Sequence, residues 1–381
     1  MRIAQLAPLY EAVPPVGYGG TERVVAGLTE ELVRSGHHVV LFASGDSVTS
    51  AELVPCCARG LRLDAAVEDP IAYYIVQLGK LVERAGEFDV IHNHIDYLAF
   101  PVAAALRLPV VTTLHGRLDL PDLQPVYAQY AEAPLVSISN AQRTPLPDAC
   151  WLATVYNGID LAHFMLREEP GRYLAFLGRI SPEKGLADAI LIARAANMPL
   201  RIAAKTDPAD REYFARTIEP MLNSPGIEYV GEINEAQKNE FLGDAYAYLF
   251  PVQWPEPFGI TMVESMACGT PVIAMARGAV PEVVIPGRTG FVCQTLPEMV
   301  GAVQRVRQIS RRACRAHVEG RFSVANMAAA YEAVYRRVIS EHKASGGARV
   351  SPLAAQAHTA GEQWQAASMT PLPNGGNIPP A

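Results

Sequence analysis

The chain has 381 residues, of which 50% are hydrophobic and 19% are charged, and its formal net charge is −7. The net negative charge argues against a general nucleic-acid binder, because such proteins neutralise phosphates with a basic face. The length exceeds that of one typical domain, so we expect two domains in an α/β protein with an ample core.

The first half of the chain alternates short apolar runs with amphipathic segments. After a Gly-rich loop at 17–20, apolar residues recur at helical spacing until Gly36 ends the predicted helix. Strands that alternate with helices in this way predict a parallel sheet covered on both faces. The strands predicted in this half lie at 3–9, 37–44, 89–94, 109–115 and 134–139.

The alternation restarts near Arg172, after a hinge. We therefore expect two doubly wound, Rossmann-like domains at 1–168 and 169–322. An apolar stripe on the predicted helix 323–341 indicates that it docks on the rest of the protein. Residues 342–381 are rich in Gly, Pro, Ala and Ser and are predicted to be disordered. The strands predicted in the second half lie at 173–180, 199–205, 227–233, 247–252 and 271–275.

The Gly-rich loop PPVGYGGTERVV could bind a phosphate, because it follows a strand and opens a helix whose amides and positive end would face an anion. A dinucleotide-binding fingerprint needs glycine at its sixth position, which is Glu22 when counted from Gly17. Asp46 could still act as the ribose-binding acid, so an NAD-dependent oxidoreductase stays open. A tight turn that only lets strand and helix pack is an equally simple interpretation.

The segment FLGRISPEKG places Arg179 and Lys184 on either side of a Ser-Pro turn that follows a strand. Both cations could converge on one diphosphate, because arginine offers a planar fork and lysine a point charge. A solvated loop would also explain either residue alone. Lysine is scarce in this chain, with five among 32 basic residues, which favours a specific use of Lys184.

The segment WPEPFGITMVE holds two glutamates near the start of a predicted helix. Glu256 lies between two prolines and so on a rigid loop, whereas helical periodicity from Gly259 places Glu264 about one turn inside the helix. Carboxylates that accept hydroxyls beside free amides that bind an anion predict a site for a sugar nucleotide. Two acids favoured by the helix dipole would explain Glu264 but not Glu256.

Together these segments resemble the retaining glycosyltransferases of family 4, which have the two-domain GT-B fold. The resemblance covers residues 1 to about 341 and includes EPFGITMVE, FLGRISPEKG, VYNGIDLAHF, GGTE and TLHG. It implies an N-terminal acceptor domain, a C-terminal donor domain facing it across a cleft, and a final helix that docks towards the N-terminal domain. It also implies a UDP- or GDP-linked sugar as co-substrate, with no metal or other cofactor. The acceptor could be a sugar, a lipid-linked compound or a small molecule.

The resemblance further implies a role for each matching residue. Glu256 would bind the transferred sugar, Glu264 the ribose, and His115 would approach the donor sugar, although a plain core histidine explains His115 as well. The implied catalytic residues are Glu256, His115, Lys184 and Arg179, and the implied donor-binding residues are Gly19, Gly20, Arg179, Lys184, Glu256, Phe258, Gly259, Ile260 and Glu264. The segment PLRIAAKTD lacks the Gly-rich turn of many members, so the base of the nucleotide stays open.

Two other patterns suggest further sites. His92, His94 and Asp96 have a spacing that resembles metal ligands, but no other ligand cluster supports a metal there. Six arginines between 305 and 321 predict a basic helical patch, either solvated or in peripheral contact with an anionic membrane. No secretory signal opens the chain and no apolar segment approaches the ~20 residues that span a bilayer, so we expect a cytoplasmic protein.

Three alternatives to a glycosyltransferase remain at this point. The oxidoreductase would leave EPFGITMVE without a role. A non-catalytic nucleotide-sugar binding protein would use the same residues but release no nucleotide. A glycoside hydrolase using the two glutamates would leave the two cations without a diphosphate to bind.

Overall fold

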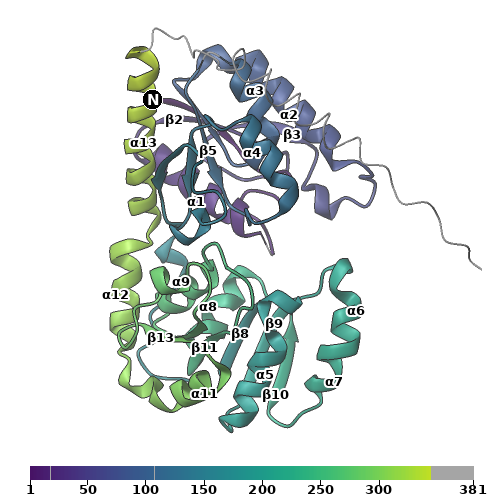
Figure 1. Ribbon diagram of the computed structural model, residues 1–381, viewed down its shortest axis with the longest axis vertical. Coiled ribbons are helices and arrows are strands. Elements are labelled where there is room, and N and C mark those ends of the chain that lie inside the picture. Colours follow the sequence, from purple (N-terminus) through teal and green to yellow (C-terminus); the bar gives the residue numbers. More distant parts are fainter. Residues whose placement is uncertain (18, 107, 345–381) are drawn as a thin grey trace, which may run out of the picture.

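The computed structural model describes residues 1–17, 19–106 and 108–344. These residues form two parallel β-sheets, each flanked by helices, that lie one above the other along the long axis of the molecule (Figure 1). The expected fold of two Rossmann-like α/β domains is therefore confirmed. The predicted disordered tail falls outside the described residues from position 345 onward.

The N-terminal sheet has seven strands in the order β3-β2-β1-β4-β5-β6-β7, and all neighbouring pairs are parallel. Its strands are β1 (Arg2–Leu6), β2 (His38–Ser44), β3 (Glu52–Cys57), β4 (Val90–Asn93), β5 (Val110–Leu114), β6 (Leu135–Ser137) and β7 (Trp151–Thr154). Its α-helices are α1 (Gly20–Arg34), α2 (Pro70–Arg84), α3 (Phe100–Ala105) and α4 (Gln124–Gln129).

The C-terminal sheet has six parallel strands in the order β10-β9-β8-β11-β12-β13. Its strands are β8 (Leu174–Arg179), β9 (Leu200–Lys205), β10 (Ile227–Gly231), β11 (Ala247–Phe250), β12 (Val272–Met275) and β13 (Gly290–Cys293). Its α-helices are α5 (Leu186–Ala195), α6 (Arg211–Tyr213), α7 (Glu219–Leu222), α8 (Glu235–Gly243), α9 (Ile260–Ala267), α10 (Val280–Val283), α11 (Leu296–Arg305) and α12 (Arg311–Arg321).

The last helix, α13 (Val324–Ala344), returns along the N-terminal domain beside α1 (Figure 1). It ends three residues beyond the expected position 341. Met327, Tyr331 and Tyr335 are buried on this helix and pack into the core that surrounds β1 and β5. This apolar stripe anchors the C-terminal end of the described chain on the first domain.

The six arginines between 305 and 321 do not form one exposed patch, so this expectation was wrong. Arg311 is buried and donates to three backbone carbonyls and to the Thr270 hydroxyl. Arg315 donates to two further backbone carbonyls, and Arg312 pairs with Glu168. The guanidinium groups therefore fix α12 to the linker between the domains and to the C-terminal core.

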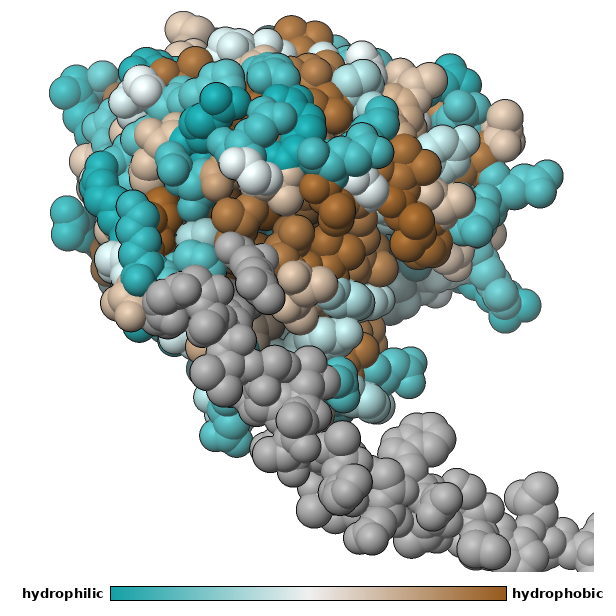
Figure 2. All heavy atoms as spheres, turned by 90° about the horizontal axis from the view of Figure 1, so that it is seen from above, coloured by the Kyte–Doolittle hydropathy of each residue, from teal (hydrophilic) through white to brown (hydrophobic). Residues whose placement is uncertain are grey.

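Hydrophobic side chains gather on the end of the molecule formed by the N-terminal domain, which Figure 2 shows from above. The exposed hydrophobic side chains of the N-terminal domain include Ile71, Ile75, Val76 and Val82 of α2. Within residues 1–17, 19–106 and 108–344, no helix combines the length and apolarity needed to cross a bilayer.

Candidate active site

A cavity of about 640 Å³ lies between the two domains and is lined by residues of both. A smaller cavity of about 70 Å³ adjoins it and shares Gly19, Gly20 and Ile260 with it. Glu264 lines the smaller cavity, and all other predicted site residues line the larger one. The predicted residues of the larger cavity are Gly19, Gly20, His115, Arg179, Lys184, Glu256, Phe258, Gly259 and Ile260.

Two helix N-termini, one from each domain, face the larger cavity. The residues preceding α1 and α9 are Gly19 and Gly259, and neither helix has a side-chain cap at its start. The first amides and the positive dipole ends of both helices are therefore available to an anion. Gly259 has φ of 79°, and a Cβ at this position would lie 2.6 Å from the Met262 Cε atom, so the turn into α9 requires glycine.

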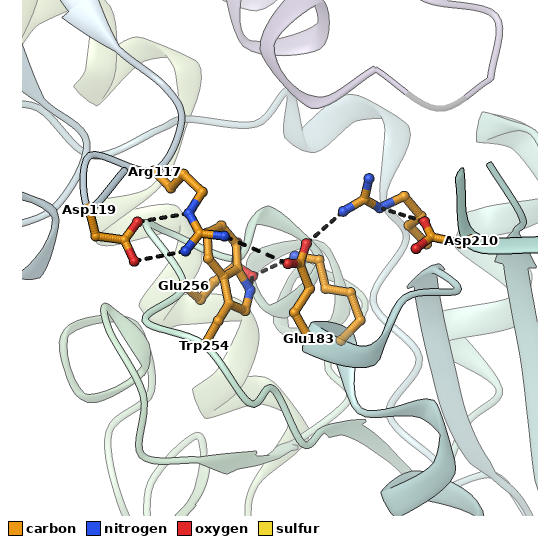
Figure 3. Close-up of polar contacts among 8 residues, drawn as sticks. Arg117, Asp119, Glu183, Asp210, Trp254 and Glu256 are labelled. Carbon is orange, nitrogen blue, oxygen red and sulfur yellow. Dashed lines mark hydrogen bonds and ion pairs between the residues drawn. The ribbon is translucent and has the colours of Figure 1, made fainter. Parts of the chain in front are cut away.

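Glu256 is buried on its proline-flanked loop and paired with a cation. Its Oε2 atom lies 2.5 Å from Lys184 Nζ and accepts a 3.0 Å hydrogen bond from Trp254 Nε1 (Figure 3). Lys184 Nζ also lies 5.1 Å from the centroid of the Trp254 ring. The two bonds fix the carboxylate where it lines the larger cavity, three residues before Gly259 at the start of α9.

Arg179 is held by acids that the sequence patterns had not singled out. Its guanidinium lies 2.6 Å from Glu183, 3.6 Å from Asp207 and 3.9 Å from Asp210. Arg117 of the N-terminal domain reaches across to within 4.0 Å of the same Glu183 (Figure 3). Arg179 and Lys184 thus line one cavity, but each is bound to its own carboxylates. A diphosphate would have to displace these acids from Arg179.

Glu264 is paired with a residue that the sequence did not suggest. Its Oε1 atom lies 2.7 Å from Lys238 Nζ of α8, and Lys238 also pairs with Glu235 at 3.2 Å. Glu264 is 1% exposed, and its Oε2 atom is buried without a hydrogen-bond partner. An unpartnered carboxylate oxygen beside a cavity is an acceptor for a ligand hydroxyl.

Three histidines of the N-terminal domain lie together, and two of them, His94 and His115, line the larger cavity. His115 follows β5, and its Nε2 atom lies 2.9 Å from His94 Nδ1. Burial lowers the pKa of His115 to about 4 and holds the pKa values of His92 and His94 well below their usual range, so all three are neutral near pH 7. No cluster suited to a metal occurs among His, Cys, Asp and Glu of the described residues.

Two acids near the cleft have raised pKa values. Burial raises the pKa of Asp96 to about 6 and that of Glu22 to about 7. Asp96 has φ of 49°, and its Oδ1 atom is buried without a partner. By contrast, the Asp46 carboxylate accepts the Gly60 amide and lines neither cavity, which removes the ribose-binding acid of the oxidoreductase alternative.

Residues 18–163 match the family described as Glycosyltransferase Family 4, and residues 162–311 match the family described as Glycosyl transferases group 1. These matches follow each other along the chain and correspond to its two sheets. The protein is a GT-B glycosyltransferase similar to family 4.

Relatives of this glycosyltransferase align over most of both chains. A glycogen synthase of Mycobacterium tuberculosis is 26% identical, over 81% of this chain and 86% of its own. A phosphatidyl-myo-inositol mannosyltransferase of Mycolicibacterium smegmatis is 28% identical, over 76% of this chain and 80% of its own. The structure of Anabaena HepE in complex with UDP-glucose superposes with a TM-score of 0.64, at 19% identity, over 91% of this chain and 100% of the other.

Proposed function

We propose that the glycosyltransferase moves a hexose from a nucleotide sugar, UDP- or GDP-linked, to an acceptor hydroxyl in the cytoplasm, with retention at the anomeric carbon and without a metal. The observation that carries this proposal is the arrangement of the paired glutamates. Glu256 and Glu264 lie in adjoining cavities beside the N-terminus of α9, and each is bound to its own lysine.

The donor would span both cavities. Its diphosphate would lie against the first amides of α9 and beside Lys184 and Arg179, since these groups provide the positive charge at the centre of the site. Its ribose would lie in the smaller cavity, where the free Oε2 atom of Glu264 can accept a hydroxyl. Its sugar would lie between Glu256 and His115, which both line the larger cavity.

Transfer breaks the bond between the anomeric carbon and the diphosphate oxygen and forms a bond from that carbon to the acceptor oxygen on the same face. Negative charge builds on the departing diphosphate, and Lys184, Arg179 and the α9 amides would stabilise it. The acceptor hydroxyl loses its proton as its new bond forms, and the leaving phosphate would take that proton. Closure of the cleft would exclude water, which would otherwise compete with the acceptor.

The functions of the relatives support the proposal. One relative is a glycogen synthase and another a mannosyltransferase, so both transfer hexoses, and the Anabaena structure holds UDP-glucose.

The assay is a screen of UDP-, GDP- and ADP-linked hexoses that follows release of the nucleoside diphosphate, with NMR of the product anomer. We expect one donor to be consumed, with retention. Activity should persist in EDTA within about twofold, because lysine, arginine and helix amides supply the charge that a metal would otherwise provide. Loss of activity in EDTA with rescue by manganese or magnesium would contradict the metal-independent site.

A further inference from the structure

A buried hydrogen-bond chain leads from His115 in the cleft into the N-terminal domain. His115 Nε2 lies 2.9 Å from His94 Nδ1, and His94 Nε2 lies 2.7 Å from Gln5 Oε1. The Gln5 amide nitrogen in turn donates to the Tyr335 hydroxyl at 3.3 Å. His94, Gln5 and Tyr335 are all buried, so water does not compete for these bonds.

The chain continues beyond Tyr335 on the same side of the sheet. The Tyr335 hydroxyl lies 2.6 Å from His92 Nδ1, and His92 Nε2 lies 2.7 Å from Thr113 Oγ1. Thr113 Oγ1 lies 2.9 Å from the Tyr331 hydroxyl. Both tyrosines belong to α13, so the last helix supplies two hydroxyl groups to a chain that begins in the cleft.

The amide of Gln5 sets the direction of every bond in this chain. A neutral imidazole has one donor and one acceptor nitrogen. Because Gln5 Oε1 only accepts, His94 must donate from Nε2 and accept at Nδ1, which leaves His115 to donate from Nε2. On the other side, Gln5 donates to the Tyr335 oxygen, so the single hydroxyl hydrogen of Tyr335 goes to His92 Nδ1. In this direction each donor of the chain has an acceptor. If the amide oxygen and nitrogen of Gln5 were exchanged, every hydrogen bond of the chain would run from donor to acceptor in the opposite direction.

We infer that His94 is a positioning residue that, oriented by Gln5 and Tyr335, holds His115 as the tautomer with its hydrogen on Nε2. His115 Nδ1 then carries the lone pair, and it has no partner among the described residues. It is an acceptor for a hydroxyl group of a bound sugar, since His115 lines the larger cavity. This use of Nδ1 rests on the proposed function, whereas the tautomer itself does not.

The two tyrosines of α13 provide a matched test of the tautomer. Tyr335→Phe removes both the acceptor of Gln5 and the donor to His92, so the Gln5 amide nitrogen loses its partner and the chain is broken beside Gln5. Tyr331→Phe removes an equally buried hydroxyl four residues away, but only at the far end of the chain. Both changes remove one buried hydroxyl group of α13, so Tyr331→Phe controls for the loss of such a group away from Gln5.

The measurement is ¹⁵N NMR of histidine-labelled protein, with the His115 signals assigned by their loss in His115→Asn. We expect His115 to carry its hydrogen on Nε2 in the wild type and in Tyr331→Phe, and a mixture of tautomers in Tyr335→Phe. A wild-type His115 with the hydrogen on Nδ1, or no difference between the two tyrosine variants, would overturn the inference. This result does not depend on any sugar transfer.

The kinetic test compares His94→Leu with His94→Asn. Leucine offers His115 no acceptor, whereas the asparagine Oδ1 can lie near the place of the imidazole Nδ1. We expect kcat to fall on the order of tenfold or more in His94→Leu, with the donor KM changed by less than about threefold, and partial recovery in His94→Asn. Equal losses in the two variants at matched thermal stability would contradict the positioning role. Absence of transfer by the wild type would instead count against the proposed function and leave the NMR result standing.

Discussion

At the residue scale, the site is built from carboxylates that are each bound to a cation. Glu264 pairs with Lys238 in a buried position, and Glu256 pairs with Lys184 in a partly buried one. Removal of one partner would leave the charge of the other unpaired. Substitution by glutamine is therefore a cleaner probe than alanine, because it keeps the shape and an acceptor oxygen. The paired lysines also offset the negative charges of the two glutamates, which would otherwise repel an anionic donor.

Glu22 allows a test of the electrostatics that is independent of activity. Burial raises its pKa from 4.5 to about 7, so the folded protein retains a proton between these pH values that the unfolded chain has released. The free energy of unfolding attributable to this group therefore falls as pH rises through that window. Glu22→Gln should be more stable than the wild type at pH 8, by up to roughly 3 kcal/mol, and about equal at pH 4.5.

Urea denaturation of Glu22→Gln and wild type at the two pH values checks this prediction. The same gain at both pH values would point to a packing effect rather than to the buried charge. No gain at pH 8 would show that Glu22 is ionised at little cost in the folded protein.

Part of the site could be predicted from the sequence, because its residues occur in short segments with strong local chemistry. Glu256, Glu264, Lys184 and Arg179 all lie at one of the two cavities, as their segments suggested. Lys238 was missed because it meets Glu264 only through the packing of α8 beside α9. The scarcity of lysine, which drew attention to Lys184, applied equally to Lys238 and could have identified it.

At the element scale, three strands were not predicted from the sequence, and all three lie at the edges of their sheets. β3 and β7 are the two edges of the N-terminal sheet, and β13 is an edge of the C-terminal sheet. Edge strands have one free side and need no continuous apolar run, so their sequences resemble loops. Pro55 within β3 is tolerated for the same reason, since proline cannot donate to a neighbouring strand. The interior strands were predicted because they are buried on both faces.

The start of α9 can be tested with a matched pair of glycine substitutions. Gly259→Ala forces a Cβ into a left-handed residue and against Met262 and Phe250, so it should destabilise the fold by about 1–3 kcal/mol. Gly301→Ala lies in the exposed interior of α11 with nothing near the new Cβ, so it should stabilise by about 0.5–1 kcal/mol. Thermal unfolding of both variants gives the comparison. Changes of the same sign would show that the turn at Gly259 does not need the positive φ.

At the scale of the whole molecule, one glutamate of the C-terminal domain binds the N-terminal domain. Glu282 of α10 accepts the backbone amides of Asn140 and Ala141 at 2.9 and 2.7 Å and the Tyr156 hydroxyl at 2.9 Å. The acceptor is charged, so each bond is stronger than a neutral one. This contact, α13 and the Arg117–Glu183 pair all join the two domains.

Glu282→Ala should loosen this contact. Loss of a hydrogen bond to a charged group, worth about 1.5–3 kcal/mol, should speed amide hydrogen exchange in the segment 138–144 by roughly tenfold or more. Mass spectrometry of exchange measures the change, with Glu298→Ala on α11 as a control that should leave the segment unaffected. Unchanged exchange in Glu282→Ala would mean that the two domains are held together at this point by other contacts.

The central claim is that one donor molecule spans both cavities, and the most direct measurement compares Glu256→Gln with Glu264→Gln. Calorimetry would give the affinity for the nucleoside diphosphate, and steady-state kinetics would give turnover with the donor. Glu264→Gln should weaken nucleoside diphosphate and donor by a similar factor. Glu256→Gln should leave nucleoside diphosphate binding unchanged or tighter, because Lys184 is released, while turnover falls by ~10²-fold or more. Abolished nucleoside diphosphate binding in Glu256→Gln, with turnover preserved at saturation, would contradict the account.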